Sequence, residues 1–272
     1  MRVQLSGVTI AYDDSGAQPA TPKPTILFIH GYPLSRKLWM PQMSDLVGSA
    51  RLLSPDLRGF GESDATPGPY SMELLAEDCI AFLDTLGIDE PVILCGLSMG
   101  GYIAFSIYRN YPQRVKGLIL ADTRAAADST EAKANRDKAI ALAEKEGADA
   151  IARLMLPKML SSRTINFRPE VVDFVRSILL SASVPGITGV LAGMRDRLDS
   201  SSILTQIRVP TLLIFGEEDQ FVPRFEVEAM RNSIKDARLH WIPDAGHLPN
   251  LEQPAMFNSL IQNYLVDFDQ HP

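Results

Sequence analysis

The stretch that decides the fold is Val92-Ile93-Leu94-Cys95-Gly96-Leu97-Ser98-Met99-Gly100-Gly101. Its first four residues are apolar, which predicts a strand buried on both faces, and a helical pattern runs from Met99 to Asn110. Gly-x-Ser-x-Gly between a strand and a helix is typical of a nucleophile elbow, which lifts the serine hydroxyl clear of the sheet. We therefore predict that Ser98 is a nucleophile; the alternative is a glycine-rich turn in which Ser98 only caps the helix.

Similar apolar or alternating segments recur along the chain and alternate with helical patterns. The eight strand candidates are Val3–Leu5, Val8–Tyr12, Thr25–Ile29, Leu52–Ser54, Val92–Cys95, Leu118–Ala121, Thr211–Phe215 and Arg238–Ile242. The helical patterns between them are Leu38–Leu46, Ser71–Leu86, Met99–Asn110, Arg224–Ser233 and Ala255–Val266. This alternation predicts an α/β fold with a mostly parallel eight-stranded sheet and helices on both faces.

The alternation breaks once, between Thr123 and about Ile207, where the chain is helix-like throughout and shows no strand candidate. Its helical pieces are Ser129–Glu146, Ala148–Met159, Pro169–Ser181 and Pro185–Leu198. We predict that residues 123–207 form a helical cap, or lid, inserted into a core domain of residues 1–122 and 208–272. The alternative is a long crossover with no role in binding.

A serine hydroxyl needs a base to take its proton, and the chain contains four histidines. His271 lies in the terminal tail, His240 lies in an alternating strand, and His30 is expected to brace its own loop by hydrogen bonds. His247 follows the last predicted strand, at the edge where open α/β sheets collect functional groups. We therefore predict His247 as the general base.

The acid that orients this imidazole is predicted to be Asp219, which follows the buried strand Thr211–Phe215. The order Ser98, Asp219, His247 is the one expected for this kind of site. The other candidates for the acid are Glu217 and Glu218 in the same loop, and Asp122 after an earlier strand.

An oxyanion hole needs two donors aimed at the developing negative oxygen. We predict the backbone N–H groups of Met99, directly after the nucleophile, and of Tyr32, in the loop after the strand Thr25–Ile29. Leu34 is the alternative second donor, whereas Pro33 has no N–H to donate.

Apolar residues near these motifs and in the predicted lid are candidates for the substrate pocket. They are Leu34, Trp39, Met155, Leu191, Met194, Val222 and Leu248. Methionines adapt to varied apolar shapes, although at helical spacing such residues are often simple packing. If the substrate were a lactone with a carboxylate, Arg124, Arg153 and Arg195 are available as cations.

Composition excludes several other classes of protein. A net charge of −7 and the absence of a basic cluster argue against nucleic-acid binding. No apolar run approaches the roughly 18 residues of a membrane span, and the N-terminus lacks a secretion signal, so we expect a cytoplasmic enzyme with no membrane partner. Cys79 and Cys95 are expected to be buried thiols, too few for a zinc site. Asp56–Ser63 lacks the Gly-Lys-Ser/Thr ending of a phosphate-binding loop and is interpreted as a structural turn with salt bridges.

Four motifs together resemble the signature set of lidded α/β-hydrolases: His30–Pro33, Asp56–Ser63, Gly96–Gly101 and Ala245–His247. More narrowly, Gly31–Leu34, Gly96–Tyr102, Ala121–Ala125 and Ala132–Arg136 resemble the small bacterial carboxylesterases, in particular a thermophilic subgroup that acts on short acyl esters. The same resemblance covers enol-lactonases and cofactor-free perhydrolases. Haloalkane dehalogenases and epoxide hydrolases of this fold carry an aspartate at the elbow, where this chain has Ser98.

The resemblance implies a carboxylesterase that hydrolyses short- to medium-chain esters through an acyl-enzyme. Its partners would be a small ester and water, with no cofactor and no metal, in a monomer or homodimer. The alternatives are an enol-lactonase or perhydrolase of the same fold, a hydroxynitrile lyase, a ligand receptor with slow hydrolysis, and a non-catalytic scaffold.

Overall fold

An eight-stranded sheet forms the centre of the molecule. The computed structural model describes residues 1–16 and 23–270, so His271 and residues 17–22 lie outside it. In spatial order the strands are β1 (Arg2–Leu5), β2 (Val8–Asp14), β4 (Arg51–Pro55), β3 (Thr25–Ile29), β5 (Val92–Leu97), β6 (Val115–Ala121), β7 (Thr211–Gly216) and β8 (Arg238–Ile242). Only the pairs β1–β2 and β2–β4 are antiparallel. The predicted mostly parallel eight-stranded sheet is confirmed.

Helices cover both faces of the sheet, as predicted. Alternate residues of β3 separate the faces, since Leu27 and Ile29 belong to one buried cluster and Ile26 and Phe28 to the other. The first face packs against α2 (Met72–Thr85), α3 (Met99–Asn110) and α8 (Arg224–Ser233), and the second against α1 (Met40–Asp45), α9 (Pro249–Glu252) and α10 (Pro254–Gln270). The single helix predicted at residues 38–46 is instead a 3-10 turn, Arg36–Trp39, followed by α1, whose first turn accommodates Pro41.

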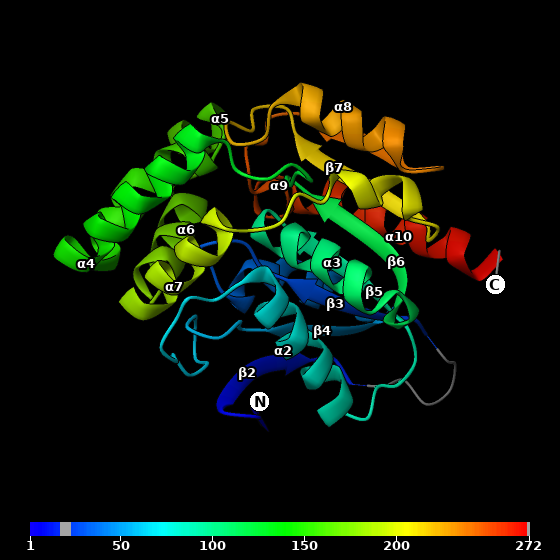
Figure 1. The fold of residues 1–272 in the computed structure, drawn as a ribbon. Helices are drawn as coiled ribbons and strands as arrows, with labels where there is room; N and C mark the ends of the chain where they lie inside the picture. The colour runs from blue at the N-terminus through cyan, green and yellow to red at the C-terminus, as the bar shows by residue number, and fades with distance from the viewer. Residues whose placement is uncertain (17–22, 271–272) are drawn as a thin grey trace.

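Between β6 and β7 the chain is helical and contains no strand among the described residues, as expected. We call its four α-helices the inserted helices: α4 (Thr130–Met159), α5 (Ser162–Phe167), α6 (Pro169–Leu180) and α7 (Val184–Arg195). Gly147, with φ 78°, interrupts α4 where the two predicted helices meet, whereas the short α5 was not predicted. The remaining 3-10 turns are Pro112–Arg114 and Ser201–Gln206. Figure 1 shows the inserted helices beyond the end of the sheet toward which β6 points.

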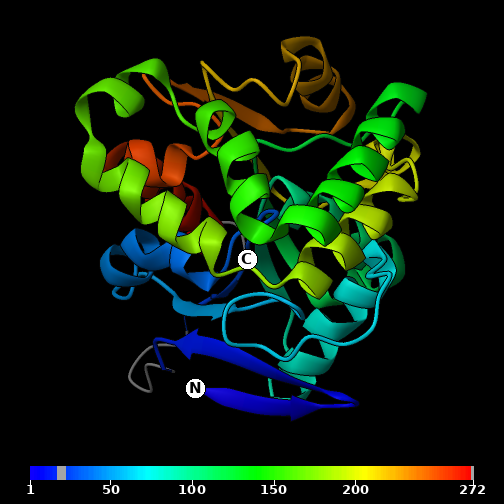
Figure 2. The ribbon, with the colours of Figure 1, turned by 90° about the vertical axis from the view of Figure 1, so that its left-hand side faces the viewer.

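The two edges of the sheet are built differently. Figure 2, viewed from the side of the inserted helices, shows the hairpin of β1 and β2 at one edge and β8 with α8 near the other. Both cysteines, Cys79 and Cys95, are free and buried, as predicted, and burial raises the pKa of each thiol. Among the described residues, no single helix is long and apolar enough to cross a membrane, and only α6 and α7 taken together, bent by 90°, pass that test.

Trp39 is a core residue of the second face and gives a test of the packing. Its side chain is fully buried, and its ring lies 4.8 Å from that of Phe28 and 6.2 Å from that of Phe257. We expect Trp39→Ala to lower the free energy of unfolding in urea by about 3–5 kcal/mol, because it leaves a large cavity. The control Phe225→Ala, at a side chain that is 72% exposed on α8, should change it by no more than about 0.5 kcal/mol. Equal effects of the two substitutions would contradict this description of the core.

Candidate active site

The turn between β5 and α3 holds Ser98 in a strained conformation. Its φ of 55° and ψ of −114° lie in a region that side-chain-bearing residues rarely adopt. The two glycines are required by close backbone contacts, since a Cβ on Gly96 would lie 2.4 Å from the Gly100 carbonyl oxygen, and a Cβ on Gly100 would lie 2.1 Å from that of Ile29. Thr123 Oγ1 donates a hydrogen bond of 2.7 Å to the Ser98 carbonyl. The local geometry is therefore that of a nucleophile elbow.

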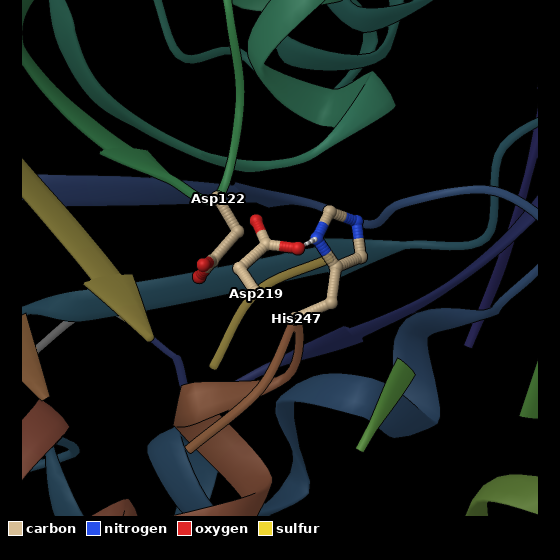
Figure 3. A group of neighbouring side chains, drawn as sticks. All are labelled: Asp122, Asp219 and His247. Carbon is tan, nitrogen blue, oxygen red and sulfur yellow. Dashed lines mark hydrogen bonds and ion pairs between the residues drawn. The ribbon is translucent and has the colours of Figure 1, made fainter. Parts of the chain in front are cut away.

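His247 and Asp219 form a buried pair. Nδ1 of His247 lies 2.9 Å from Oδ1 of Asp219, and their side chains are only 4% and 3% exposed. The backbone N–H of Phe221 donates to the same Oδ1 at 2.8 Å, and the Phe221 ring lies 4.6 Å from the imidazole. Figure 3 shows Asp219 between His247 and Asp122. An imidazole held in this way has its Nδ1 occupied, so its other nitrogen is the one available for proton transfer.

The backbone of the His247 loop is tied to the end of α4. The N–H of His247 donates to the Met159 carbonyl at 2.9 Å. Glu252, buried in α9, accepts hydrogen bonds of 2.7 Å from the N–H of Gly246 with one carboxylate oxygen and from the N–H of Ser161 with the other. Glu252 therefore bridges the histidine loop and the inserted helices. Sequence analysis missed this residue, because nothing in the pattern of α9 distinguishes it from a surface glutamate.

Asp122, one of the alternative acids, is a fully buried carboxyl group beside Asp219. Its Oδ1 accepts a hydrogen bond of 2.9 Å from the N–H of Gly216. The Oδ2 atoms of Asp122 and Asp219 have no hydrogen-bond partner among the described residues. One possible metal-ligating atom from each aspartate and one from His247 all lie within 4.8 Å of one another. Burial, and then the charge of Asp219, raise the pKa of Asp122 well above its usual range. Burial therefore favours the protonated form of Asp122, whereas Asp219 is the acid that is hydrogen-bonded to the imidazole.

The same three side chains are close enough to be considered as metal ligands. Zinc holds nitrogen and oxygen ligands at about 2.0–2.2 Å, which separates neighbouring ligand atoms by more than 3 Å. The distance of 2.9 Å between Nδ1 and Oδ1 is instead that of a charge-assisted hydrogen bond. The arrangement fits proton transfer better than metal binding.

The other candidate acids and His30 have different roles. Glu217 is exposed, and Glu218 accepts a hydrogen bond of 2.9 Å from the N–H of Ser162, so neither contacts the imidazole in the described hydrogen bonds. His30 is fully buried, with Nδ1 2.9 Å from the Gly31 carbonyl and Nε2 accepting from the N–H of Leu57 at 3.0 Å. Burial lowers the pKa of His30, so it is a neutral brace for its loop, as expected.

The loop after β3 packs directly on the elbow. A Cβ on Gly31 would lie 3.1 Å from the Leu97 carbonyl oxygen and 3.3 Å from Ser98 Cβ. The N–H of Leu34 donates to the Gly31 carbonyl at 2.9 Å, so this amide is already engaged. This favours the amide of Tyr32 over that of Leu34 as the second oxyanion donor, opposite Met99 at the start of α3.

The segment Asp56–Ser63 is a structural turn, as interpreted from its sequence. Buried Asp56 accepts hydrogen bonds from the N–H groups of Arg36 at 2.7 Å and Glu62 at 2.9 Å, and it forms an ion pair with the Arg36 guanidinium. Arg58 forms a bidentate ion pair with Asp78 on α2. These contacts hold the turn against its neighbours. Both arginines are paired with aspartates, so the turn does not resemble a phosphate-binding loop.

A cavity of about 310 Å³ is lined by several of the predicted site residues, although Asp219 and Met99 are not on its wall. Ser98, His247 and Tyr32 lie on its wall, along with four of the seven predicted pocket residues, namely Met155, Leu191, Met194 and Val222. The other wall residues are Tyr102, Arg124, Ala132, Asn135, Arg136, Ala139, Ile151, Leu154, Lys158 and Phe221. Of the three arginines proposed as cations, only Arg124 is on the wall.

Three predicted pocket residues, Leu34, Trp39 and Leu248, do not line this cavity. All three are buried in the cluster on the other face of the sheet, with Ile26 and Phe28. They are close to the motifs along the chain, but their side chains turn away from the cavity into the core. Nearness in sequence is therefore a poor guide in loops, where no repeating pattern fixes the direction of a side chain.

The cavity residues on α4 carry a signal that the sequence analysis did not use. They fall into two sets with the spacing i, i+3, i+4, i+7, one on each side of Gly147: Ala132, Asn135, Arg136 and Ala139, and then Ile151, Leu154, Met155 and Lys158. This spacing places each set on one face of the helix. The faces were overlooked because they mix polar and apolar residues.

Comparison with known proteins agrees with this geometry. A sequence model of the alpha/beta hydrolase fold family matches residues 24–254. The chain is an α/β-hydrolase. A solved structure of a thermophilic esterase from Thermogutta terrifontis, with malate bound, is 38% identical, with a TM-score of 0.93 and coverage of 98% of each chain. Both the family and this fold are therefore shared with a solved esterase.

Two further relatives are enol-lactonases. The crystal structure of the enol-lactonase from Burkholderia xenovorans LB400 is 26% identical to this α/β-hydrolase, with a TM-score of 0.90 and coverage of 98% of this chain and 100% of that one. 3-Oxoadipate enol-lactonase 2 of Acinetobacter baylyi is 27% identical over 91% of this chain and 90% of its own length.

The raised pKa of Asp122 predicts how stability depends on pH. Above about pH 4 the unfolded chain releases this proton, whereas the folded protein keeps it. The folded state then binds one more proton, so this group lowers the free energy of unfolding by up to about 1.4 kcal/mol per pH unit as pH rises. Asp122→Asn keeps the shape and removes the titration. In urea unfolding, its stability relative to wild type should increase as pH rises above about 4, up to the raised pKa of Asp122 in the folded protein. A constant difference would show that Asp122 is ionised in the folded protein.

Proposed function

We propose that this α/β-hydrolase is a carboxylesterase that cleaves short- to medium-chain carboxylic esters, with Ser98, His247 and Asp219 as its catalytic triad. The observation that carries the proposal is the buried hydrogen bond between Asp219 and His247, whose imidazole lines the same cavity as Ser98. The strained backbone of Ser98 adds support, because strain of this kind is concentrated at functional sites.

The proposed reaction is a two-step acyl transfer. His247 takes the proton of Ser98 as the oxygen attacks the ester carbonyl, and the amides of Met99 and Tyr32 stabilise the oxyanion. The carbon–oxygen bond to the alcohol breaks, and His247 gives the proton to the departing alkoxide. A water then gives a proton to His247 and attacks the acyl-enzyme; the bond to Ser98 breaks, His247 returns the proton to the Ser98 oxygen, and the acid is released.

We also propose that residues 123–207 are a lid over a core formed by residues 1–122 and 208–272. The support is that α4 and α7 supply most of the cavity wall, while Ser98 and His247 belong to the core. Met155 and Met194 on this wall can adapt to different acyl groups. The similarity to the thermophilic esterase, at 38% identity, favours the same class of reaction.

An enol-lactonase is the second candidate function, and it would use the same nucleophile and base. It is favoured by the enol-lactonase relatives and by Arg124 on the cavity wall, which could bind the carboxylate of a lactone acid. A perhydrolase would share the acyl-enzyme, and a ligand receptor would turn over only a few times. Continuous turnover of an ester separates the enzyme from the receptor.

A panel of p-nitrophenyl esters from acetate to laurate, run beside an enol-lactone, tests the proposed reaction. We expect the short esters to be hydrolysed continuously and laurate slowly, because the cavity holds only about 310 Å³. Ser98→Ala should lose roughly a million-fold in kcat and should no longer react with a fluorophosphonate probe. Wild-type protein that does not react with the probe, or that stops after a few turnovers, would overturn the proposal.

The two neighbouring aspartates allow a matched test of the acid. Asp219→Asn should lower kcat roughly 10,000-fold, because the amide cannot stabilise the charged imidazole and favours the wrong tautomer. Asp122→Asn makes the same chemical change on the neighbouring carboxyl group and should lower kcat less than about 10-fold, since Asp122 has no hydrogen bond to the imidazole and burial raises its pKa. The reverse order of the two losses would identify Asp122 as the acid.

A further inference from the structure

The cavity is positively charged on an otherwise negative protein. The net charge of the chain is −7, yet Arg124, Arg136 and Lys158 line the cavity and no aspartate or glutamate is among its described wall residues. Two of these cations, Arg136 and Lys158, belong to the two sets of wall residues on α4, and Arg124 follows β6. A charged group that enters this cavity is therefore favoured if it is an anion.

The arginines of the wall share acidic partners, whereas the lysine does not. Buried Asp128 forms ion pairs with Arg124 at 3.0 Å, with Arg136 and with Arg197, and Arg124 also lies 3.4 Å from Glu226. The charge of Arg197 also helps to lower the pKa of Asp199, so three carboxylates neighbour these three guanidinium groups. Lys158, an exposed residue, takes part in none of the ion pairs between described residues, so it adds a positive charge to the wall that no carboxylate offsets.

The hydroxyl of Tyr32 supplies an unused hydrogen-bond donor on the same wall. The residue is 7% exposed, and its hydroxyl is buried with no partner in the described structure. Burial raises the pKa of Tyr32, and the nearby charge of Arg136 opposes this only in part, so the hydroxyl keeps its proton. A buried donor without a partner is costly unless a ligand accepts its hydrogen bond.

We propose that the preferred substrate carries a free carboxylate, which binds to Tyr32 Oη, Arg136 and Lys158 while Ser98 attacks the ester carbonyl. The inference rests on the proposed esterase function and narrows its substrate to monoesters or lactones derived from small dicarboxylic acids. A carboxylate accepts several hydrogen bonds at once, which suits a cavity lined by residues with a hydroxyl, a guanidinium and an ammonium group. A cavity of about 310 Å³ limits the acid to a short chain.

Matched pairs of esters test this preference on the purified full-length protein. We compare the monomethyl esters of succinic, glutaric and adipic acid with the methyl esters of the corresponding monoamides, which have the same shape and no charge. Release of acid is followed in a pH-stat. At the best chain length, kcat/KM should be about 10- to 100-fold higher for the acid than for the amide, which is the effect of a charge-assisted contact.

Variants then assign the preference to named side chains. Tyr32→Phe, Arg136→Gln and Lys158→Gln should each lower the acid-to-amide ratio of kcat/KM several-fold. The control Arg176→Gln makes the same change of charge at an exposed residue of α6 that pairs with Asp173, and it should leave the ratio unchanged. If loss of the Asp128 ion pair unfolds Arg136→Gln, the other two variants carry the test.

The outcomes separate this inference from the proposed function. Hydrolysis of the amide esters at rates equal to or above those of the acid esters would overturn the carboxylate site and leave the esterase intact. A preference for the acids that none of the three variants reduces would also overturn it. Failure to cleave either series, together with no reaction of Ser98 with the fluorophosphonate probe, would overturn both proposals.

Discussion

The close approach of three backbone segments at the elbow is the constraint on which the rest of the site depends. β3, β5 and the first turn of α3 come so near to one another that a single methyl group at Gly96 or Gly100 would overlap a carbonyl. This contact fixes where Ser98 stands relative to the sheet. It also brings the loop of Gly31 and Tyr32 against the elbow, so the nucleophile and the proposed oxyanion donors share one rigid support.

Two buried acids lie beside the imidazole. Asp219 and Asp122 both lie in a site almost closed to water, where two adjacent negative charges would be costly. Asp219 accepts hydrogen bonds from the imidazole and from a backbone N–H. Asp122 accepts one backbone N–H in the described structure, and burial raises its pKa. Position along the chain made both residues candidates, whereas hydrogen bonding and solvent access decide between them.

The sequence predicted the structure well where a regular apolar pattern ended in a turn. All eight strands, the hairpin and the helical insertion follow from apolar runs and their spacing, and the positions of Ser98, Asp219 and His247 follow from loops at strand ends. The prediction failed for Leu34, Trp39 and Leu248, because the direction of a side chain in an irregular loop depends on tertiary packing.

Contacts between distant segments also could not be predicted from the sequence. The bridge made by Glu252 joins α9, the His247 loop and the end of α4, and no local signal marks it. The wall residues of α4 are different, since their helical spacing was visible in the sequence. Apart from Met155, they were missed because only the folded chain shows that a face with arginine, asparagine and lysine looks inward.

The break at Gly147 divides α4, which lines the cavity, into two helical arms. Each arm contributes one face to the cavity, and none of those eight side chains takes part in the hydrogen bonds that hold His247 or Asp219. In the proposed mechanism these eight side chains bear on substrate choice and not on the orientation of the imidazole, whereas Tyr32 takes part in both. Such a layout lets a lineage acquire a new substrate by changes in a few helical turns while its chemistry is inherited intact.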